Sequence, residues 1–152
     1  MTINSAAIFA ALGSHAQSTG LFDRVNGHEP RNPPGNGLTV AFWFAGLVPV
    51  PLASGLAATS ARLTFTARVY APALMEPQDA IDPTVLAAAD ALMIAYSGDF
   101  TLGALIRDVD LLGHSGLQLS AQPGWLDMGE AKFRTVDITI PMVISDAWTQ
   151  AE

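Results

Sequence analysis

The sequence predicts an α+β fold in which a mostly antiparallel β-sheet packs against an N-terminal helix and a second helix at about residues 83–97. Two neighbouring patterns support this prediction. Residues 62–70 alternate between polar and apolar side chains, which is the pattern of a half-buried strand. Residues 85–96 then carry apolar side chains at helical spacing. The length is that of one domain, so we expect a single domain over residues 1–152.

The first third of the chain predicts a short helix followed by a loop. Asn4 or Ser5 can cap the helix, since their side-chain oxygens accept hydrogen bonds from free N–H groups, and Gly13 weakens its end. Residues 21–25 predict a brief extended segment. Nine of the twelve residues in 26–37 are Gly, Pro or Asn, which is a loop composition.

A strand is predicted over residues 38–45, and an apolar arm rich in proline follows it. Two prolines lack the N–H donors of a central strand, so the arm must lie on a sheet edge or protrude. It could contact another subunit or fold back over its own sheet, and the sequence leaves both open. The arm consists of Val48, Pro49, Val50, Pro51 and Leu52.

The second helix is predicted to begin with Asp82 as its N-cap and Pro83 as its first residue. Its apolar stripe consists of Val85, Leu86, Ala89, Leu92, Met93 and Tyr96. Residues 101–112 fit either a helix or a strand, and we predict a strand because Gly103 and two β-branched residues disfavour a helix. Residues 125–128 and 132–142 flank Gly129 and Glu130 and predict a hairpin, with Pro141 marking an edge or a bulge.

The composition excludes several classes of protein. A formal charge of −7 argues against a free-standing nucleic-acid or anionic-membrane binder, and all of the excess acid lies after residue 60. The chain has no cysteine, which excludes disulfide scaffolds and thiolate metal sites and agrees with a reducing cytosol. Only 14% of residues are charged and half are apolar, which indicates surface buried against other subunits.

Residues 32–61 contain no charged residue, so they could form either a membrane-spanning helix or β-strands. The run is long enough to span a bilayer, but it contains prolines and glycines and has no basic cluster at either end. The first basic residue is Arg24, so the N-terminus makes a poor signal peptide. We therefore expect strands here and no membrane segment.

Candidate catalytic and metal-binding residues are few and scattered. His15, His28 and His114 are far apart, and a metal site at His28 and Glu29 would need a distant third ligand. Asp108 and Asp110 would share one side of a strand, where they could bind a cation or act as an acid/base pair, although such pairs are more often solvated. A rival hypothesis places a small-ligand or enzymatic site around His28, Arg107, Asp108 and His114. We expect no metal and no turnover.

Short segments along nearly the whole chain resemble the tail terminator proteins of long-tailed (siphovirus) actinobacterial phages. The longest are residues 54–62 (SGLAATSAR), 76–83 (EPQDAIDP) and 96–103 (YSGDFTLG). Shorter ones are residues 28–30, 34–38, 69–70, 109–113, 119–122, 138–141 and 146–148. The resemblance implies an α+β subunit of a hexameric ring that caps the tail tube and joins it to the neck, without catalysis or cofactor. Neighbouring roles, as an adaptor, a stopper or a tube subunit, stay open.

This role implies partners and contact residues. The partners would be other copies of the chain, the tail tube protein and the neck connector or stopper protein, with DNA only passing through the channel. The protein would be made in the bacterial host cytoplasm and reside in the virion, at the tail–neck junction. We expect subunit or tube contacts at the apolar arm, His28 and Arg31. The acids predicted to face the channel are Asp108, Asp110, Asp127, Glu130 and Asp137.

Overall fold

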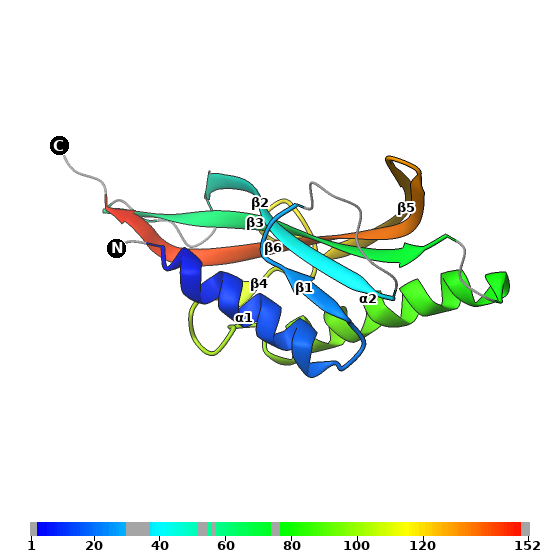
Figure 1. The fold of residues 1–152 in the computed structure, drawn as a ribbon. Coiled ribbons are helices and arrows are strands. Elements are labelled where there is room, and N and C mark those ends of the chain that lie inside the picture. The colour runs from blue at the N-terminus through cyan, green and yellow to red at the C-terminus, as the bar shows by residue number, and fades with distance from the viewer. Residues whose placement is uncertain (1–2, 30–36, 52–54, 56, 74–76, 150–152) are drawn as a thin grey trace.

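The structure, a computed structural model, describes residues 3–29, 37–51, 55, 57–73 and 77–149. These form two α-helices and a six-stranded, mostly antiparallel sheet, which confirms the predicted α+β fold (Figure 1). In chain order the elements are α1 (Ser5–Ser18), β1 (Arg24–Asn26), β2 (Thr39–Val50), β3 (Ala58–Pro72), the 3₁₀ turn η1 (Gln78–Ala80), α2 (Ile81–Gly98), β4 (Asp108–Val109), β5 (Ser120–Met128) and β6 (Ala131–Thr149).

The sheet is built around β3 and β6, two long antiparallel strands that pair along most of their length. The order across the sheet is β1-β2-β3-β6-β4, and β5 also pairs with β6. The second edge of β6 is therefore shared, because β5 pairs with Ala131 to Thr139 and β4 pairs with Met142 and Val143. Among the strands that the structure describes, only β1 runs parallel to its neighbour, pairing with β2 from Thr39 to Ala41.

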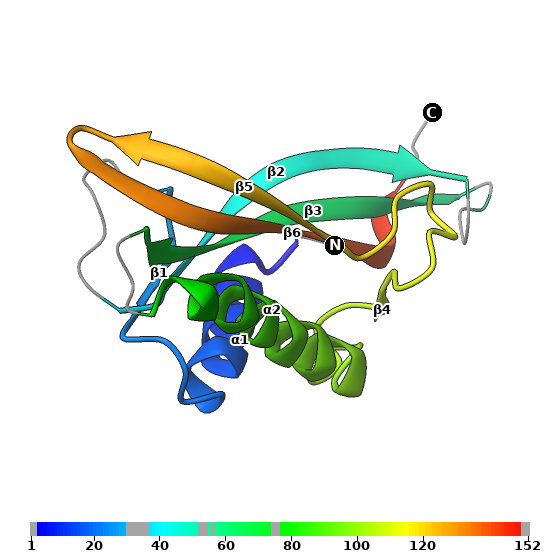
Figure 2. The ribbon, with the colours of Figure 1, turned by 90° about the vertical axis from the view of Figure 1, so that its right-hand side faces the viewer.

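Both helices lie on the same face of the sheet, which we call the helix side, and the opposite face is the open face (Figure 2). The main core lies between the helices and the alternate residues of β3 and β6. Its fully buried members include Leu12, Phe65, Leu92, Tyr96, Ile138 and Ile140. A second, smaller cluster of Ala41, Tyr70 and Phe133 is buried elsewhere in the sheet, with Trp43 and Leu126 packed against it.

Helix α1 is longer than the sequence predicts. The Asn4 side chain accepts a hydrogen bond from the Ala7 amide, so the predicted cap is confirmed. Gly13 does not end the helix, which continues to Ser18 because Leu12 and Ala16 are both buried against the rest of the core. Tertiary packing outweighs the modest helix penalty of one glycine.

Helix α2 begins at Ile81, directly after η1, and Asp82 is not its cap. Asp82 instead accepts a hydrogen bond from the Arg134 side chain at 2.9 Å, and Pro83 is tolerated because it lies in the first helical turn. By length and composition Gln78–Gly98 could cross a membrane. Here it packs as a core helix, with Val85, Leu92 and other side chains buried against the sheet.

Two polar contacts join the helices to each other. The Tyr96 hydroxyl donates to the Leu12 carbonyl at 3.0 Å, and burial raises the pKa of this phenol well above its usual range. His15 Nε2 lies 2.9 Å from a carboxylate oxygen of Asp99. Hydrogen bonds from the Gly103 amide and from His15 lower the pKa of Asp99.

The predicted strand over residues 101–112 is wrong for most of its length. Only Asp108 and Val109 form a strand, and a tight turn precedes them. Leu102, Gly103 and Ala104 all have positive φ angles, of 49°, 66° and 70°, which no strand contains. Burial in this segment does not follow the alternation: Leu102, Ile106 and Val109 are buried, whereas Leu105, Leu111 and Leu112 are exposed. The Asp99 carboxylate holds the turn by accepting a hydrogen bond from the Gly103 amide.

Two of the strand prolines, Pro49 and Pro141, lie at positions that explain their missing N–H donors. Pro49 lies within β2, beyond the short stretch that β1 covers, so it occupies a sheet edge as predicted. Pro141 lies inside β6, opposite Thr64 of β3. The Pro141 carbonyl accepts a hydrogen bond from the Asp110 amide. Pro141 therefore lies where the second partner of β6 changes from β5 to β4. The predicted hairpin is confirmed as β5 and β6.

Candidate subunit-contact surfaces

The first candidate surface is apolar and lies on the helix side, at the end of the sheet where β2 ends and β3 begins. We call it the distal surface. Phe44, Leu47 and Trp148 form it and are exposed, by 56%, 38% and 37%. They line a groove of about 590 Å³ whose other walls are Ile3, Ser5, Phe9, Leu63 and Phe65.

The distal surface exists because the sheet extends further than the helix that covers it. Phe44 pairs with Phe65 of β3, and Leu47 pairs with Leu63. Residues three apart on a regular strand point to opposite faces, but a register shift between Phe44 and Gly46 returns Leu47 to the helix side. Helix α1 begins at Ser5 and leaves this end of the sheet uncovered (Figure 1).

The predicted arm is divided by the structure. Val48, Pro49 and Pro51 are exposed; Pro49 and Pro51 remain candidates for contacts with other subunits, whereas Val48 pairs with Arg62 and points to the opposite face from Leu47. Val50 is 3% exposed, so its side chain packs within its own subunit and the prediction that it contacts another is wrong. Leu52 and Arg31 lie outside the described residues. His28 is exposed.

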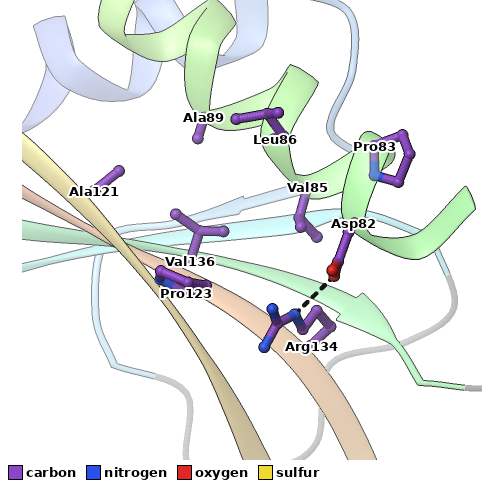
Figure 3. Close-up of a pocket in the computed structure, with 9 residues that line it drawn as sticks. All are labelled: Asp82, Pro83, Val85, Leu86, Ala89, Ala121, Pro123, Arg134 and Val136. Carbon is purple, nitrogen blue, oxygen red and sulfur yellow. Dashed lines mark hydrogen bonds and ion pairs between the residues drawn. The ribbon is translucent and has the colours of Figure 1, made fainter.

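The second candidate surface is a groove between α2 and the β5–β6 hairpin, which we call the proximal groove. It has a volume of about 450 Å³. Figure 3 shows its lining of mostly apolar side chains: Pro83, Val85, Leu86, Ala89, Ala121, Pro123 and Val136, with Asp82 and Arg134 paired at one end. Leu86 was predicted to belong to the core stripe of α2, but it is 69% exposed at the groove.

Trp125 stands exposed beside the proximal groove. Its ring lies under the guanidinium of Arg134, at 4.8 Å, and under the Lys132 ammonium, at 5.8 Å. Arg134 also donates to the Gly124 carbonyl, so both the ion pair and the ring hold it in place. An exposed tryptophan and a fixed arginine beside an apolar groove are the residue types that dominate binding energy at protein interfaces.

The open face carries a charged cluster whose members pair with one another. Arg68 forms two hydrogen bonds with the Asp137 carboxylate, at 2.6 and 3.1 Å, and its guanidinium lies 5.1 Å from the Trp43 ring. The hydrogen bond to Asp137 raises the pKa of Arg68. Asp137 is thus half-buried and paired, which differs from the prediction of an acid that lines a channel.

Asp110 organises the loop that connects β4 and β5. Its carboxylate accepts hydrogen bonds from the amides of Gly113, His114 and Ser115 and from the Ser115 hydroxyl. Burial opposes its ionisation, but these hydrogen bonds together lower the pKa of Asp110. Asp110 is 2% exposed, so the prediction that it is a solvent-facing acid is wrong.

The rival small-ligand site is partly assembled. Arg107, Asp108 and His114 line a pocket of about 490 Å³ together with exposed Leu111 and Leu112. Burial raises the pKa of Asp108, and nearby Arg107, at 3.7 Å, opposes that rise. His28 does not line this pocket. The predicted group of four residues is therefore reduced to three.

The remaining predicted acids, Asp127 and Glu130, are exposed at the turn of the β5–β6 hairpin. They lie at the opposite end of the hairpin from Ser120, and so away from Asp108. Within the described ranges no three His, Asp or Glu side chains come close enough to hold a metal ion. No family model matches the chain, and no curated protein matches it.

Sequence reasoning missed both apolar surfaces. The signal for the distal surface was present in Phe44 and Leu47, but their shared face depends on the register shift between them. The signal for the proximal groove was Leu86, which widened the apolar stripe of α2 beyond what the sheet covers. Both surfaces depend on where the helices end relative to the sheet, which no local pattern specifies.

Proposed function

We propose that the chain is a structural virion protein, a phage tail terminator whose copies form a ring of six at the end of the tail tube. Its partners are other copies of itself, the tail tube protein and the neck connector or stopper protein. The resemblance of short segments across nearly the whole chain suggests this role. The virion, at the tail–neck junction, is then its place of action.

One observation carries the proposal most directly: apolar surface is left uncovered at both ends of the helix side. Phe44, Leu47 and Trp148 are exposed at the distal end, and Leu86 and Trp125 at the proximal end. Exposed apolar patches at two separate places are expected of a subunit that contacts two neighbours, since a ring requires two different surfaces on each copy.

Sedimentation velocity and negative-stain imaging test the proposal. We expect the protein to form rings, either alone at high concentration or on the ends of assembled tail tubes. Particle images separate the neighbouring roles, because a tube subunit would lie along the tail and an adaptor or stopper would lie nearer the head. A protein that stays monomeric alone and in the presence of tubes contradicts the proposal.

Acids exposed in such a ring would help DNA to pass without binding. A wall that carries Asp127 and Glu130 would repel phosphates, and like charges are screened over about 8 Å at physiological salt. Replacing Asp127 and Glu130 with lysine is expected to leave rings intact and to slow genome ejection. Unchanged ejection kinetics would show that these two acids do not face the channel.

A second candidate function is favoured by the pocket around Arg107, Asp108 and His114. A carboxyl group with a raised pKa beside an arginine and a histidine is a combination that binding sites use. A thermal-shift screen of small acids and sugars tests it, with Asp108→Asn as the control variant. A ligand that stabilises the parent protein but not the variant would favour this function over the ring.

A further inference from the structure

We propose that the subunits of the ring join head to tail, with the distal surface of one copy seated in the proximal groove of the next. This inference rests on the proposed function and specifies how its subunits would meet. The distal surface lies near the start of β3 and the proximal groove near the start of α2, and Figure 1 shows these two element ends at opposite ends of the elongated sheet. A contact between two different surfaces leaves one of each free, so it can propagate until a ring closes.

The distal surface has the chemistry that the groove requires. Phe44, Leu47 and Trp148 carry no charge, and the sequence has no charged residue from 32 to 61. In the groove, Asp82 and Arg134 already neutralise each other at 2.9 Å. Seating the distal surface there would bury apolar atoms against apolar atoms, without leaving a charge unpaired.

Charge also argues against a two-fold contact between two proximal ends. Acids outnumber bases there, with Asp79, Asp82, Asp127 and Glu130 against Lys132 and Arg134. Two such ends brought together would place like charges opposite each other, which opposes association. The uncharged distal surface imposes no such cost, so the acidic end is better matched by the distal end of another copy.

Prolines in β2 and β5 disfavour pairing of strand edges between subunits, so we expect the contact to be made by side-chain packing. The outer edge of β2 contains Pro49, and β5 contains Pro123. A proline removes one ladder donor, and edge prolines are a known means of preventing strand addition. The Pro123 ring instead forms part of the groove wall, as Figure 3 shows.

Cysteine cross-linking tests the pairing of the two surfaces, because the chain has no cysteine of its own. Leu47→Cys and Leu86→Cys place one thiol on each surface. Treated with a short bismaleimide, a mixture of the two single variants should give a cross-linked dimer, while each variant alone should not. The double variant should give a ladder of higher oligomers. Leu47→Cys mixed with Ser18→Cys, a position on α1 outside both surfaces, should give no dimer.

A pair of adjacent substitutions supplies a matched control. Leu47 and Val48 are both 38% exposed, but Leu47 pairs with buried Leu63 and Val48 pairs with Arg62, so they point to opposite faces. Leu47→Asp should shift the sedimentation coefficient of the assembly to that of the monomer. Val48→Asp should leave it unchanged. Equal loss of assembly in both variants would contradict the contact proposed here.

The outcomes separate the two proposals. Rings without a Leu47–Leu86 cross-link, or each single variant cross-linking with itself, would overturn the head-to-tail contact and leave the ring function standing. A chain that remains monomeric under all conditions would overturn both.

Discussion

Phe44 and Phe65 lie opposite each other on neighbouring strands and point to the same side of the sheet, yet their environments differ completely. Phe65 is 1% exposed and Phe44 is 56% exposed. Leu63 and Leu47 repeat the contrast, with 4% and 38%. Phe9 of α1 accounts for the difference, since its ring centroid lies 4.6 Å from that of Phe65. The same residue type on the same face is thus buried in the core or exposed according to whether a helix covers it.

The largest expected effect comes from truncating the two phenylalanines. Phe65→Ala should lower the free energy of unfolding by about 3–5 kcal/mol, because it leaves a cavity under α1. Phe44→Ala should change it by less than about 0.5 kcal/mol, because the side chain is mostly in water. Urea denaturation of monomeric protein, at low concentration, measures both. Similar losses for the two variants would show that the distal surface is part of the core.

Asp110 and Asp108 extend the contrast to charged groups. Asp110→Asn should cost about 2–3 kcal/mol at pH 7, because buried amide donors lose a charged acceptor. Asp108→Asn should instead raise the free energy of unfolding at pH 7, since the fold disfavours the ionised form of Asp108.

The pH dependence of stability gives the same pair an independent check. The pKa of Asp110 is lowered in the fold, so its contribution is complete above its unfolded pKa and is lost as pH falls through the folded pKa. The pKa of Asp108 is raised, so its contribution is present below its unfolded pKa and is lost as pH rises through the folded pKa. The free energy of unfolding should therefore depend less on pH between pH 2 and 7 in Asp110→Asn than in the parent protein.

Tyr96 tests a buried hydrogen bond between the two helices, where we expect a smaller loss of stability. Tyr96→Phe removes the hydrogen bond to the Leu12 carbonyl but keeps the ring, so we expect a loss of about 1 kcal/mol. Thermal unfolding followed by circular dichroism measures this loss. His15→Gln is the neighbouring comparison, because the contact between His15 and Asp99 is part-exposed and should contribute less. A larger loss of stability in His15→Gln than in Tyr96→Phe would show that the contact between His15 and Asp99 is the stronger link between the helices.

The smallest effect is expected at the proximal groove. Leu86→Ala should change the stability of the monomer by less than about 0.5 kcal/mol, since the side chain is 69% exposed. The same variant should weaken assembly if the groove receives another copy. An unfolding midpoint that falls as far as it does in Leu92→Ala would mean that Leu86 supports its own fold.

The sequence alone was sufficient for the elements with long, regular patterns. The alternation in 62–70 gave β3, the helical spacing in 85–96 gave α2, and Gly129 with Glu130 gave the hairpin turn. These are local signals, and each is reinforced by burial of one face. The prediction for segment 101–112 is wrong because the chain turns there through left-handed residues such as Leu102 and Ala104, for which the sequence carries no propensity signal.

The candidate surfaces were less accessible to prediction. Val50 was expected at an interface because it lies among prolines, but it points into its own subunit, and Asp110 was expected in solvent, but its own loop surrounds it. Both errors concern the direction of one side chain, which tertiary contacts decide. The sequence did indicate that uncharged surface would remain uncovered, from the absence of charge in 32–61.

Strand β6 extends from the proximal hairpin at Ala131 to the distal end at Thr149, with a register shift against β3 between Ile144 and Trp148. It pairs with β3 over most of that length, from Phe133 opposite Pro72 to Thr149 opposite Ala58. A pull between the two ends of the molecule would therefore act along these two strands and load their hydrogen bonds together, in shear. Rupture would require many bonds to fail at once rather than one after another. The same two strands that form the core thus make the subunit a mechanically stiff link along its long axis.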